Sequence, residues 1–282
     1  MDAFPSVVRI EPAGVCNFKC THCLVGRHGG AGRIMSFDTF VRIFEILPAV
    51  PRVLVLYHAG EPLLNKHLEL MVNYAHVWGV EKIVFNTNAS MITPDRDLSQ
   101  VDELRVSFDG ASAAENDKIR TNSNFEQDAY KVKRLALSNM RPTVIKIYNV
   151  QKDTDKPAKY LRDYFADCPG VEFEGFRMRE WARAQNEPQP TNGARYCKDL
   201  FESFTITSNG NSVKCCEDLL QEDVTGNVYG QSPLEIWQSM QPIRDAFKRG
   251  DYPKQCQSCW VLTRGAEKEK VKPAPVKKKA KK

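Results

Sequence analysis

Short runs of β-branched and aromatic residues alternate along the first 180 residues with segments whose apolar positions recur every three or four residues. The short runs have the period expected of strands, and the longer segments have the period expected of helices. We therefore predict six strands, at Ser6–Glu11, Arg52–His58, Lys82–Asn88, Leu104–Phe108, Thr143–Val150 and Val171–Arg177.

The clearest helical segment begins after Ser36, a residue type that caps helix starts. Its apolar residues lie on one face, as in an amphipathic helix. These residues are Phe37, Phe40, Val41, Phe44 and Leu47. The same periodicity predicts helices at His67–Trp78, Phe125–Ser138 and Ala158–Asp167, and a weaker pattern predicts one at Asp95–Gln100.

Strands that are each followed by a helix pair in parallel through right-handed crossovers. The fold class that we predict is therefore α/β, with the six strands forming a partial (β/α)6 barrel or an open arc of one. Functional groups of such barrels lie at the carboxyl ends of the strands. Each N-terminal motif described below comes directly after a strand.

The pattern changes after about residue 178. Ser203–Cys215 alternates around Asn209-Gly210, the strongest short signal for a hairpin. Pro233–Arg249 predicts one helix or a pair of short ones, and from Gly265 the chain has too few apolar residues to fold. We predict a barrel domain at 1–180, a small hairpin-plus-helix domain at 181–263 and a disordered basic tail at 264–282.

The chain has 282 residues, of which 42% are apolar, enough for one catalytic domain with a small appendage. No run reaches the roughly 20 apolar residues of a membrane helix, and we find no signal-peptide pattern at the start. We therefore expect a cytoplasmic protein without a membrane partner. In a reducing compartment its nine cysteines indicate metal or redox chemistry rather than disulfides.

The formal net charge of +5 comes from the end of the chain. From Val261 onward nine Lys or Arg residues stand against two Glu residues, so the remainder of the chain is slightly acidic. The final lysines have no aromatic residues among them to stack on bases, so we expect no specific nucleic-acid partner. Weak, salt-sensitive phosphate binding is expected of any such run.

Three cysteines, Cys16, Cys20 and Cys23, lie within eight residues after the first strand. Three thiolates at this spacing can bind three corners of a cubane iron–sulfur cluster and leave one iron open to another ligand. The alternatives are a zinc site or a plain electron-transfer cluster. Zinc usually takes four ligands, and His22, between two of the cysteines, can hardly turn onto the same metal.

Cys-x3-Cys-x2-Cys after the first strand resembles the signature of the radical S-adenosylmethionine (SAM) superfamily. The resemblance implies a [4Fe–4S] cluster whose open iron binds SAM and cleaves it reductively to a 5′-deoxyadenosyl radical, which abstracts hydrogen from a substrate. His58–Leu63 resembles the family's Gly-Gly-Glu-Pro segment, with Ala59 in place of the first glycine. The SAM-binding residues that the resemblance implies are Gly60, Glu61, Asn88, Ser107, Asp109 and Arg120.

A second cysteine set lies in the C-terminal part and comprises Cys197, Cys215, Cys256 and Cys259. It resembles the shortened SPASM domain, often named Twitch, which implies one auxiliary [4Fe–4S] cluster. A zinc ribbon would show a similar distribution. Cys216 adjoins Cys215 and could replace it as a ligand, although the spacing from Gly210 favours Cys215.

A fully ligated auxiliary cluster has no open iron, so electron transfer is its natural role. Relatives with one such cluster include 2-deoxy-scyllo-inosamine dehydrogenase. Our hypothesis is a radical SAM oxidoreductase that oxidises an alcohol of a sugar- or cyclitol-like substrate, with the auxiliary cluster as electron acceptor. A reductant such as flavodoxin or ferredoxin is the expected partner.

Three alternatives stay open. A radical epimerase would use Cys216, or else Cys168, as hydrogen donor. A ribosomal-peptide maturase would act on a peptide instead of a small molecule. A zinc- or cluster-binding scaffold would have no enzymatic activity.

Overall fold

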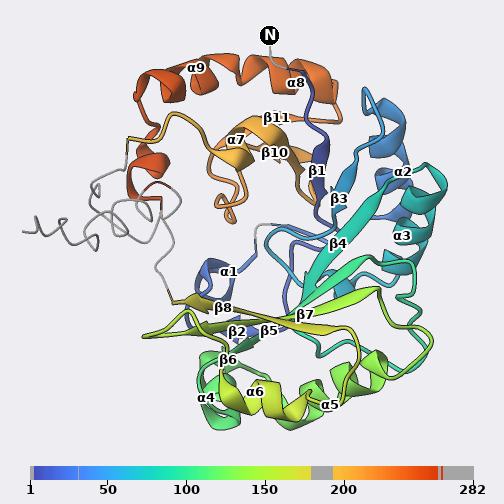
Figure 1. Cartoon of the computed structure of the whole chain (residues 1–282). Coiled ribbons are helices and arrows are strands. Elements are labelled where there is room, and N and C mark those ends of the chain that lie inside the picture. The colour runs from blue at the N-terminus through green and yellow to red at the C-terminus, as the bar shows by residue number, and fades with distance from the viewer. Residues whose placement is uncertain (1–2, 31, 179–192, 260–261, 263–282) are drawn as a thin grey trace, which may run out of the picture.

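The computed structural model of the chain describes residues 3–30, 32–178, 193–259 and 262. The predicted domain boundary near residue 180 and the predicted tail at 264–282 lie outside these residues. The described part contains one long curved sheet, and α2 to α6 lie along its outer side (Figure 1). No helix within this part is long and apolar enough to cross a membrane.

Six strands of the sheet form the predicted barrel arc. In spatial order they are β1 (Val7–Ile10), β3 (Val53–Val55), β4 (Lys82–Thr87), β5 (Glu103–Asp109), β7 (Val144–Gln151) and β8 (Val171–Arg177). Every neighbouring pair among them is parallel. The partial (β/α)6 barrel is therefore confirmed, although β3 is shorter than predicted.

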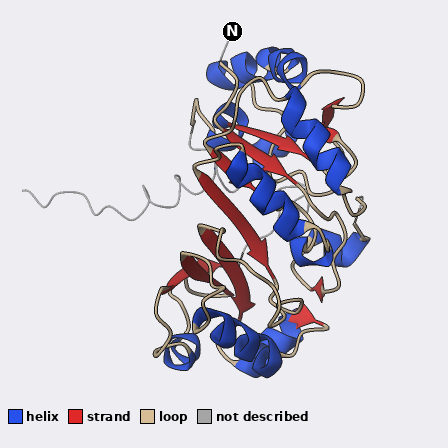
Figure 2. Ribbon diagram, turned by 90° about the vertical axis from the view of Figure 1, so that its right-hand side faces the viewer, coloured by secondary structure: helices blue, strands red, loops and turns tan. Residues whose placement is uncertain are grey.

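Helices cover the outer face of this arc (Figure 2). They are α2 (Phe37–Ile46), α3 (Leu68–Val77), α4 (Ala113–Ile119), α5 (Phe125–Ala136) and α6 (Lys159–Tyr164). Along β5, Leu104, Val106 and Phe108 are at most 1% exposed and belong to the main core. Because side chains alternate along a strand, Arg105 and Ser107 point the other way, into the barrel interior.

The helix predicted at Asp95–Gln100 is wrong, because this segment forms turns. The Asp97 carboxylate accepts a hydrogen bond from the Ser99 backbone N–H at 3.0 Å, which favours a turn over a helix. Leu98 and Val101 are fully buried and fill the core here. The chain therefore passes from β4 to β5 without a helix. Among the described residues of the barrel arc, two α-helices were not predicted from the sequence, α1 (Leu24–His28) and α4.

The C-terminal part begins with α7 (Lys198–Glu202), β9 (Ser203–Ile206), β10 (Asn211–Val213) and β11 (Val224–Asn227). It continues with α8 (Pro233–Ser239), α9 (Gln241–Arg249) and the 3-10 helix η3 (Lys254–Ser258). The predicted hairpin is confirmed, since β9 and β10 are antiparallel and Gly210 in the turn has φ of 78°. The segment Pro233–Arg249 forms a pair of helices.

A parallel pairing between β1 and β9 was not predicted. It places β1 between β3 and β9, so one sheet of nine strands runs through both parts of the chain. Aromatic contacts stabilise the junction between the two parts. The centroid of the Phe4 ring lies 5.3 Å from that of Phe204 and 6.3 Å from that of Trp237. The Trp237 indole N–H also donates to the Ala3 carbonyl at 3.0 Å.

Candidate functional site

The cysteines of the first set lie on the segment between β1 and α1. Cys20 belongs to the two-residue strand β2 (Lys19–Cys20), which pairs with β6 (Arg120–Thr121) so that Cys20 lies opposite Arg120. The Cys23 backbone N–H donates to the Cys20 carbonyl at 3.1 Å, and α1 begins directly after Cys23. The three thiols are therefore held on one compact loop beyond the carboxyl end of β1.

These thiols act on one another electrostatically. Burial raises the pKa of Cys16, and it raises the pKa of Cys20 to about 11. The neighbouring thiols raise both pKa values further, whereas the Arg120 guanidinium lowers them. Thiolates in this loop therefore need added positive charge, which iron supplies. In number and chemistry, the three cysteines fit a cluster with one open iron.

Glu61 is the best-anchored residue of the segment predicted to meet SAM. Its buried carboxylate accepts hydrogen bonds from the Thr87 hydroxyl at 2.8 Å and from the Asn88 backbone N–H at 2.7 Å. It also accepts one from the Leu63 N–H at 3.0 Å. These bonds fix the segment against the carboxyl end of β4. The SAM contact predicted for Glu61 would then come through the backbone, and it stays a prediction.

Gly60 lies against the cysteine loop. A Cβ atom built on Gly60 would stand 2.2 Å from the Ala13 carbonyl oxygen and 2.4 Å from the Val15 carbonyl oxygen. Both neighbours are backbone atoms that cannot turn away. The Glu61 N–H donates to the same Val15 carbonyl at 2.8 Å, which holds the two segments together.

We therefore expect Gly60→Ala to lower the free energy of unfolding by about 1–3 kcal/mol, because the added methyl group overpacks this contact. SAM affinity should fall at least about tenfold, since the segment must shift. Ala59→Gly next to it is the matched control and should change stability by no more than about 1 kcal/mol. Chemical denaturation and SAM titration measure both effects. Equal behaviour of the two variants would contradict the close approach of Gly60.

The other predicted SAM residues divide into two groups. Asn88 lies against the cysteine loop, where its side-chain amide N–H donates to the Asn17 side-chain oxygen at 2.9 Å and approaches the Cys16 sulfur at 3.9 Å. Ser107 is half-buried on β5, on the face that points into the barrel. The structure thus places Asn88 beside the cysteines and Ser107 in the barrel interior.

Asp109 and Arg120 form a buried ion pair of 2.8 Å beside the same loop. The Arg120 guanidinium also lies 5.7 Å from the centre of the Phe18 ring. His22 has its Nε2 atom 3.9 Å from the Asp109 carboxylate, so its ring is directed towards Asp109. That His22 does not share a metal with its neighbouring cysteines stays a prediction.

All four cysteines of the second set line one cavity. It contains about 390 Å³ of space not filled by protein atoms, counting the part that opens to solvent. Besides Cys197, Cys215, Cys256 and Cys259, the cavity is lined by Cys216, Asp199 and Lys214, among others. The set predicted from the sequence therefore converges in space, and it fits a cluster by its donor chemistry.

Charges around this cavity are balanced locally. Burial raises the pKa of Cys256 to about 11, while the nearby Lys214 ammonium lowers it. Lys214 is 5% exposed and contacts Asp223 at 2.8 Å and the Gln255 side-chain oxygen at 2.7 Å. Burial also raises the pKa of Cys216 well above its ordinary value, with Asp199 raising it further and Arg9 lowering it.

Among the described residues, no three His, Cys, Asp or Glu side chains converge on one point as a single metal ion requires. In a cubane cluster each thiolate binds a different iron, so the ligands surround a wider volume.

Glu11 connects the two parts of the chain and was not singled out from the sequence. One oxygen of its fully buried carboxylate accepts from the Ala59 N–H at 2.9 Å. The other accepts from the Ser208 N–H at 2.9 Å and from the Ser208 hydroxyl at 2.8 Å. A second connection is His58, whose Nε2 atom lies 3.0 Å from the Asp218 carbonyl.

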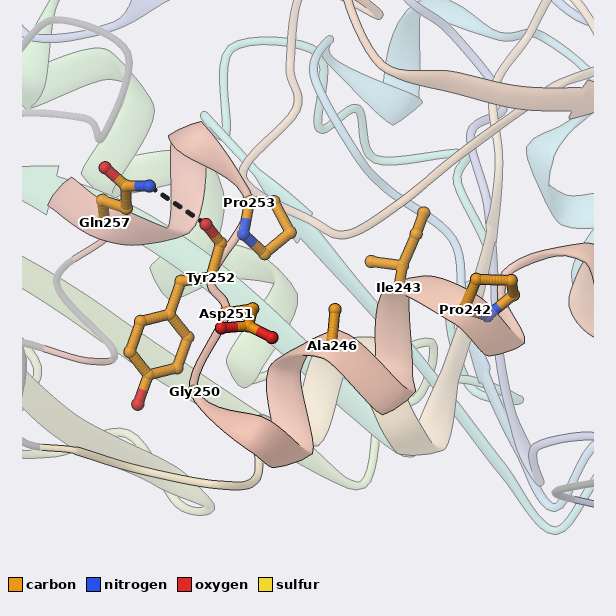
Figure 3. Close-up of a pocket in the computed structure, with 8 residues that line it drawn as sticks. All are labelled: Pro242, Ile243, Ala246, Gly250, Asp251, Tyr252, Pro253 and Gln257. Atoms are coloured by element: carbon orange, nitrogen blue, oxygen red, sulfur yellow. Dashed lines mark hydrogen bonds between the residues drawn. The ribbon is translucent and has the colours of Figure 1, made fainter.

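A second hollow, a groove, lies along α9 and the loop that follows it (Figure 3). It is lined mainly by apolar side chains and backbone, including Ile243, Ala246 and Tyr252. Gln257 closes one end by donating to the Tyr252 carbonyl at 3.0 Å. None of the predicted site residues lines this groove.

Two family profiles match the chain. The profile described as the radical SAM superfamily matches residues 10–165, and the profile described as an iron-sulfur cluster-binding domain, SPASM, matches residues 197–260. Mycofactocin maturase MftC of Mycolicibacterium smegmatis is 27% identical over 158 residues, which are 54% of this chain and 40% of MftC. The chain thus matches less than half the length of this relative.

Solved structures resemble the whole described fold. BtrN in complex with AdoMet and 2-DOIA superimposes with a TM-score of 0.58 at 18% identity, covering 91% of this chain and 93% of BtrN. Native anSMEcpe with bound AdoMet superimposes with a TM-score of 0.63 at 14% identity, covering 92% of this chain and 88% of that one. At these identities the likeness establishes the fold.

Proposed function

Because the chain belongs to the radical SAM superfamily, we propose that it oxidises an alcohol carbon of a sugar- or cyclitol-like substrate. The observation that carries the proposal is the place of the second cysteine cavity. Asp199 lines this cavity, and its carboxylate lies 3.8 Å from the guanidinium of Arg9 on β1. The cavity is thus next to the barrel interior, where a substrate radical could pass on an electron.

In this proposal Cys16, Cys20 and Cys23 hold the cluster that binds SAM, and the second set holds the auxiliary cluster. The members of the second set are Cys197, Cys215, Cys256 and Cys259. The SAM contacts proposed are those of Gly60, Glu61, Asn88, Ser107, Asp109 and Arg120. When bound, these groups supply hydrogen-atom abstraction and a one-electron acceptor.

The chain's own residues provide shielding and charge. Leu24, Val25 and Leu219 form a small buried cluster against which Cys16 and Cys23 pack, so apolar side chains from both parts cover the first loop. Arg120 near the first thiols and Lys214 near the second cavity are both buried cations. Buried positive charge favours the thiolate over the thiol and offsets the negative charge of the ligands.

Two alternatives have specific support. Cys216 lines the second cavity close to Arg9, and a thiol there could return a hydrogen atom, as in a radical epimerase. The similarity to a mycofactocin maturase favours a peptide substrate instead. Flavodoxin or ferredoxin stays the proposed reductant in every case.

Replacing Cys216 by alanine separates oxidation from epimerisation. We expect Cys216→Ala to keep at least half of the wild-type rate with an alcohol substrate, and to form deoxyadenosine and oxidised product in equal amounts, because a dehydrogenase needs no returned hydrogen. Chromatography of anaerobic reactions with reductant and a panel of cyclitols and sugars measures both products. Cys168→Ala is the control, since Cys168 is not among the residues that line the cavity.

Two results would refute alcohol oxidation. One is deoxyadenosine without any oxidised product across the panel. The other is a wild-type enzyme that inverts a carbon centre and a Cys216→Ala variant that does not.

A further inference from the structure

Cations and aromatic rings alternate across the barrel interior. The Arg9 guanidinium on β1 lies 5.0 Å from the centre of the Tyr57 ring, and the Arg105 guanidinium on β5 donates to the Tyr57 hydroxyl at 3.1 Å. Arg105 then lies 5.5 Å from the centre of the Tyr148 ring on β7. Two guanidinium groups from separate strands therefore contact one tyrosine, one near its ring and the other at its hydroxyl.

Arg9 is a buried cation that keeps one donor unpaired. Its side chain is 9% exposed, and its Nε–H has no hydrogen-bond partner among the described residues. Its nearest carboxylate, Asp199, stands 3.8 Å away, which is too far for a hydrogen bond. A guanidinium offers five N–H donors in a fixed fork, and burying it without acceptors is costly.

The carboxylates around this row are largely engaged elsewhere. Glu103 contacts both Arg105 at 2.6 Å and Lys82 at 2.7 Å, so two cations share one carboxylate. Glu172 and Glu174 lie 3.6 and 3.9 Å from the Lys146 ammonium. The Glu11 carboxylate accepts its bonds from Ala59 and Ser208. Among the described residues, the Arg9 Nε–H beside Tyr57 is thus a buried guanidinium donor that no protein oxygen accepts from.

We propose that the substrate carries an anionic group, a carboxylate or a phosphate ester, which binds between Arg9 and Arg105 beside Tyr57. Guanidinium forks bind both kinds of anion through paired hydrogen bonds. The tyrosine ring provides a flat apolar face for the substrate's carbon skeleton. The inference rests on the proposed function only in placing the substrate in the barrel interior.

The test is equilibrium binding to the anaerobic, cluster-loaded full-length protein, without reductant and therefore without turnover. Three probes share one ring: glucose, glucuronate and glucose 6-phosphate. We expect at least one of the two anions to bind at least about tenfold more tightly than glucose. One charge-assisted hydrogen bond contributes enough binding free energy for a difference of this size. The ratio between the two anions tells a carboxylate site from a phosphate site.

Arg9→Gln and Arg105→Gln should each weaken binding of the preferred anion about tenfold or more and leave glucose unchanged. Arg52→Gln, which removes an exposed guanidinium, is the matched control and should bind as the wild type does. With two variants on different strands, failure of one to fold leaves the other as a test. Loss in either one supports the site, provided that its iron content equals that of the wild type.

Three results would overturn the inference. They are equal affinity for glucose and both anions, no binding of either anion, and unchanged anion binding in the arginine variants. Because the readout is binding, the enzyme could fail to oxidise any alcohol and still confirm the anion site. If the enzyme oxidises a neutral alcohol but binds neither anion, the proposed function holds and the anion site is refuted.

Discussion

A variant in which Cys16, Cys20 and Cys23 are all alanine is expected to bind about four iron atoms per chain after anaerobic reconstitution, against about eight for the wild type. The two cysteine sets lie on different segments, one on the loop after β1 and the other around the cavity between α7, β10 and η3. Loss of the first three thiols therefore leaves the second cavity intact. SAM cleavage should fall below detection, because no open iron remains.

Iron and acid-labile sulfide are measured per chain in the wild type and in the triple variant. Cys168→Ala is the control and should bind as much iron as the wild type. A drop from about four irons to none, with zinc present, would mean that the second set forms a structural zinc site. Electron transfer to an auxiliary cluster would then be excluded. Reactions without net oxidation, such as epimerisation, would become the leading candidates.

Replacing Glu11 by alanine is expected to lower the free energy of unfolding by about 3–6 kcal/mol. Three donors would lose their acceptor: the half-buried N–H of Ala59 and the buried N–H and hydroxyl of Ser208. Each buried unsatisfied donor costs about 1–3 kcal/mol. Glu45→Ala on the exposed face of α2 is the matched control, with an expected change within about 0.5 kcal/mol.

Glu11→Gln gives a finer test of the same contact. The amide oxygen of glutamine can still accept a hydrogen bond. Its NH₂ group, however, would face an N–H donor, that of either Ala59 or Ser208. We expect a smaller loss of stability together with a larger fraction of deoxyadenosine released without product, because Ala59 and Ser208 would no longer be held at a fixed separation. If the product ratio of Glu11→Gln equals that of the wild type, Glu11 stabilises the fold without positioning the two sites.

The sequence predicted those features that depend on local pattern. The alternation of apolar residues along a strand and the spacing of Cys16, Cys20 and Cys23 can both be seen within a few consecutive residues. The second cysteine set could be predicted through its resemblance to a known domain, and the structure brings its members into one cavity. The hairpin at Asn209-Gly210 is equally local, because glycine tolerates the positive φ of the turn.

Features that depend on distant partners could not be predicted. Glu11 is one charged residue in a strand-like run, and its partner Ser208 lies 197 positions away. Nothing near Arg120 in the sequence indicates that it pairs with Asp109 behind the cysteine loop. The segment after β4 shows a weak helical pattern, but the Asp97 side chain and the burial of Leu98 favour turns.

The pairing of β1 with β9 also has a consequence for biosynthesis. Val7 pairs with Val53 on one side and with Ser203 on the other, so β1 cannot complete its hydrogen bonds until β9 has left the ribosome. At about 5–20 residues per second, this takes about 10–40 s after β1 is made. During that interval the edge of β1 that later pairs with β9 stays open, with its backbone N–H and C=O groups available to other strands.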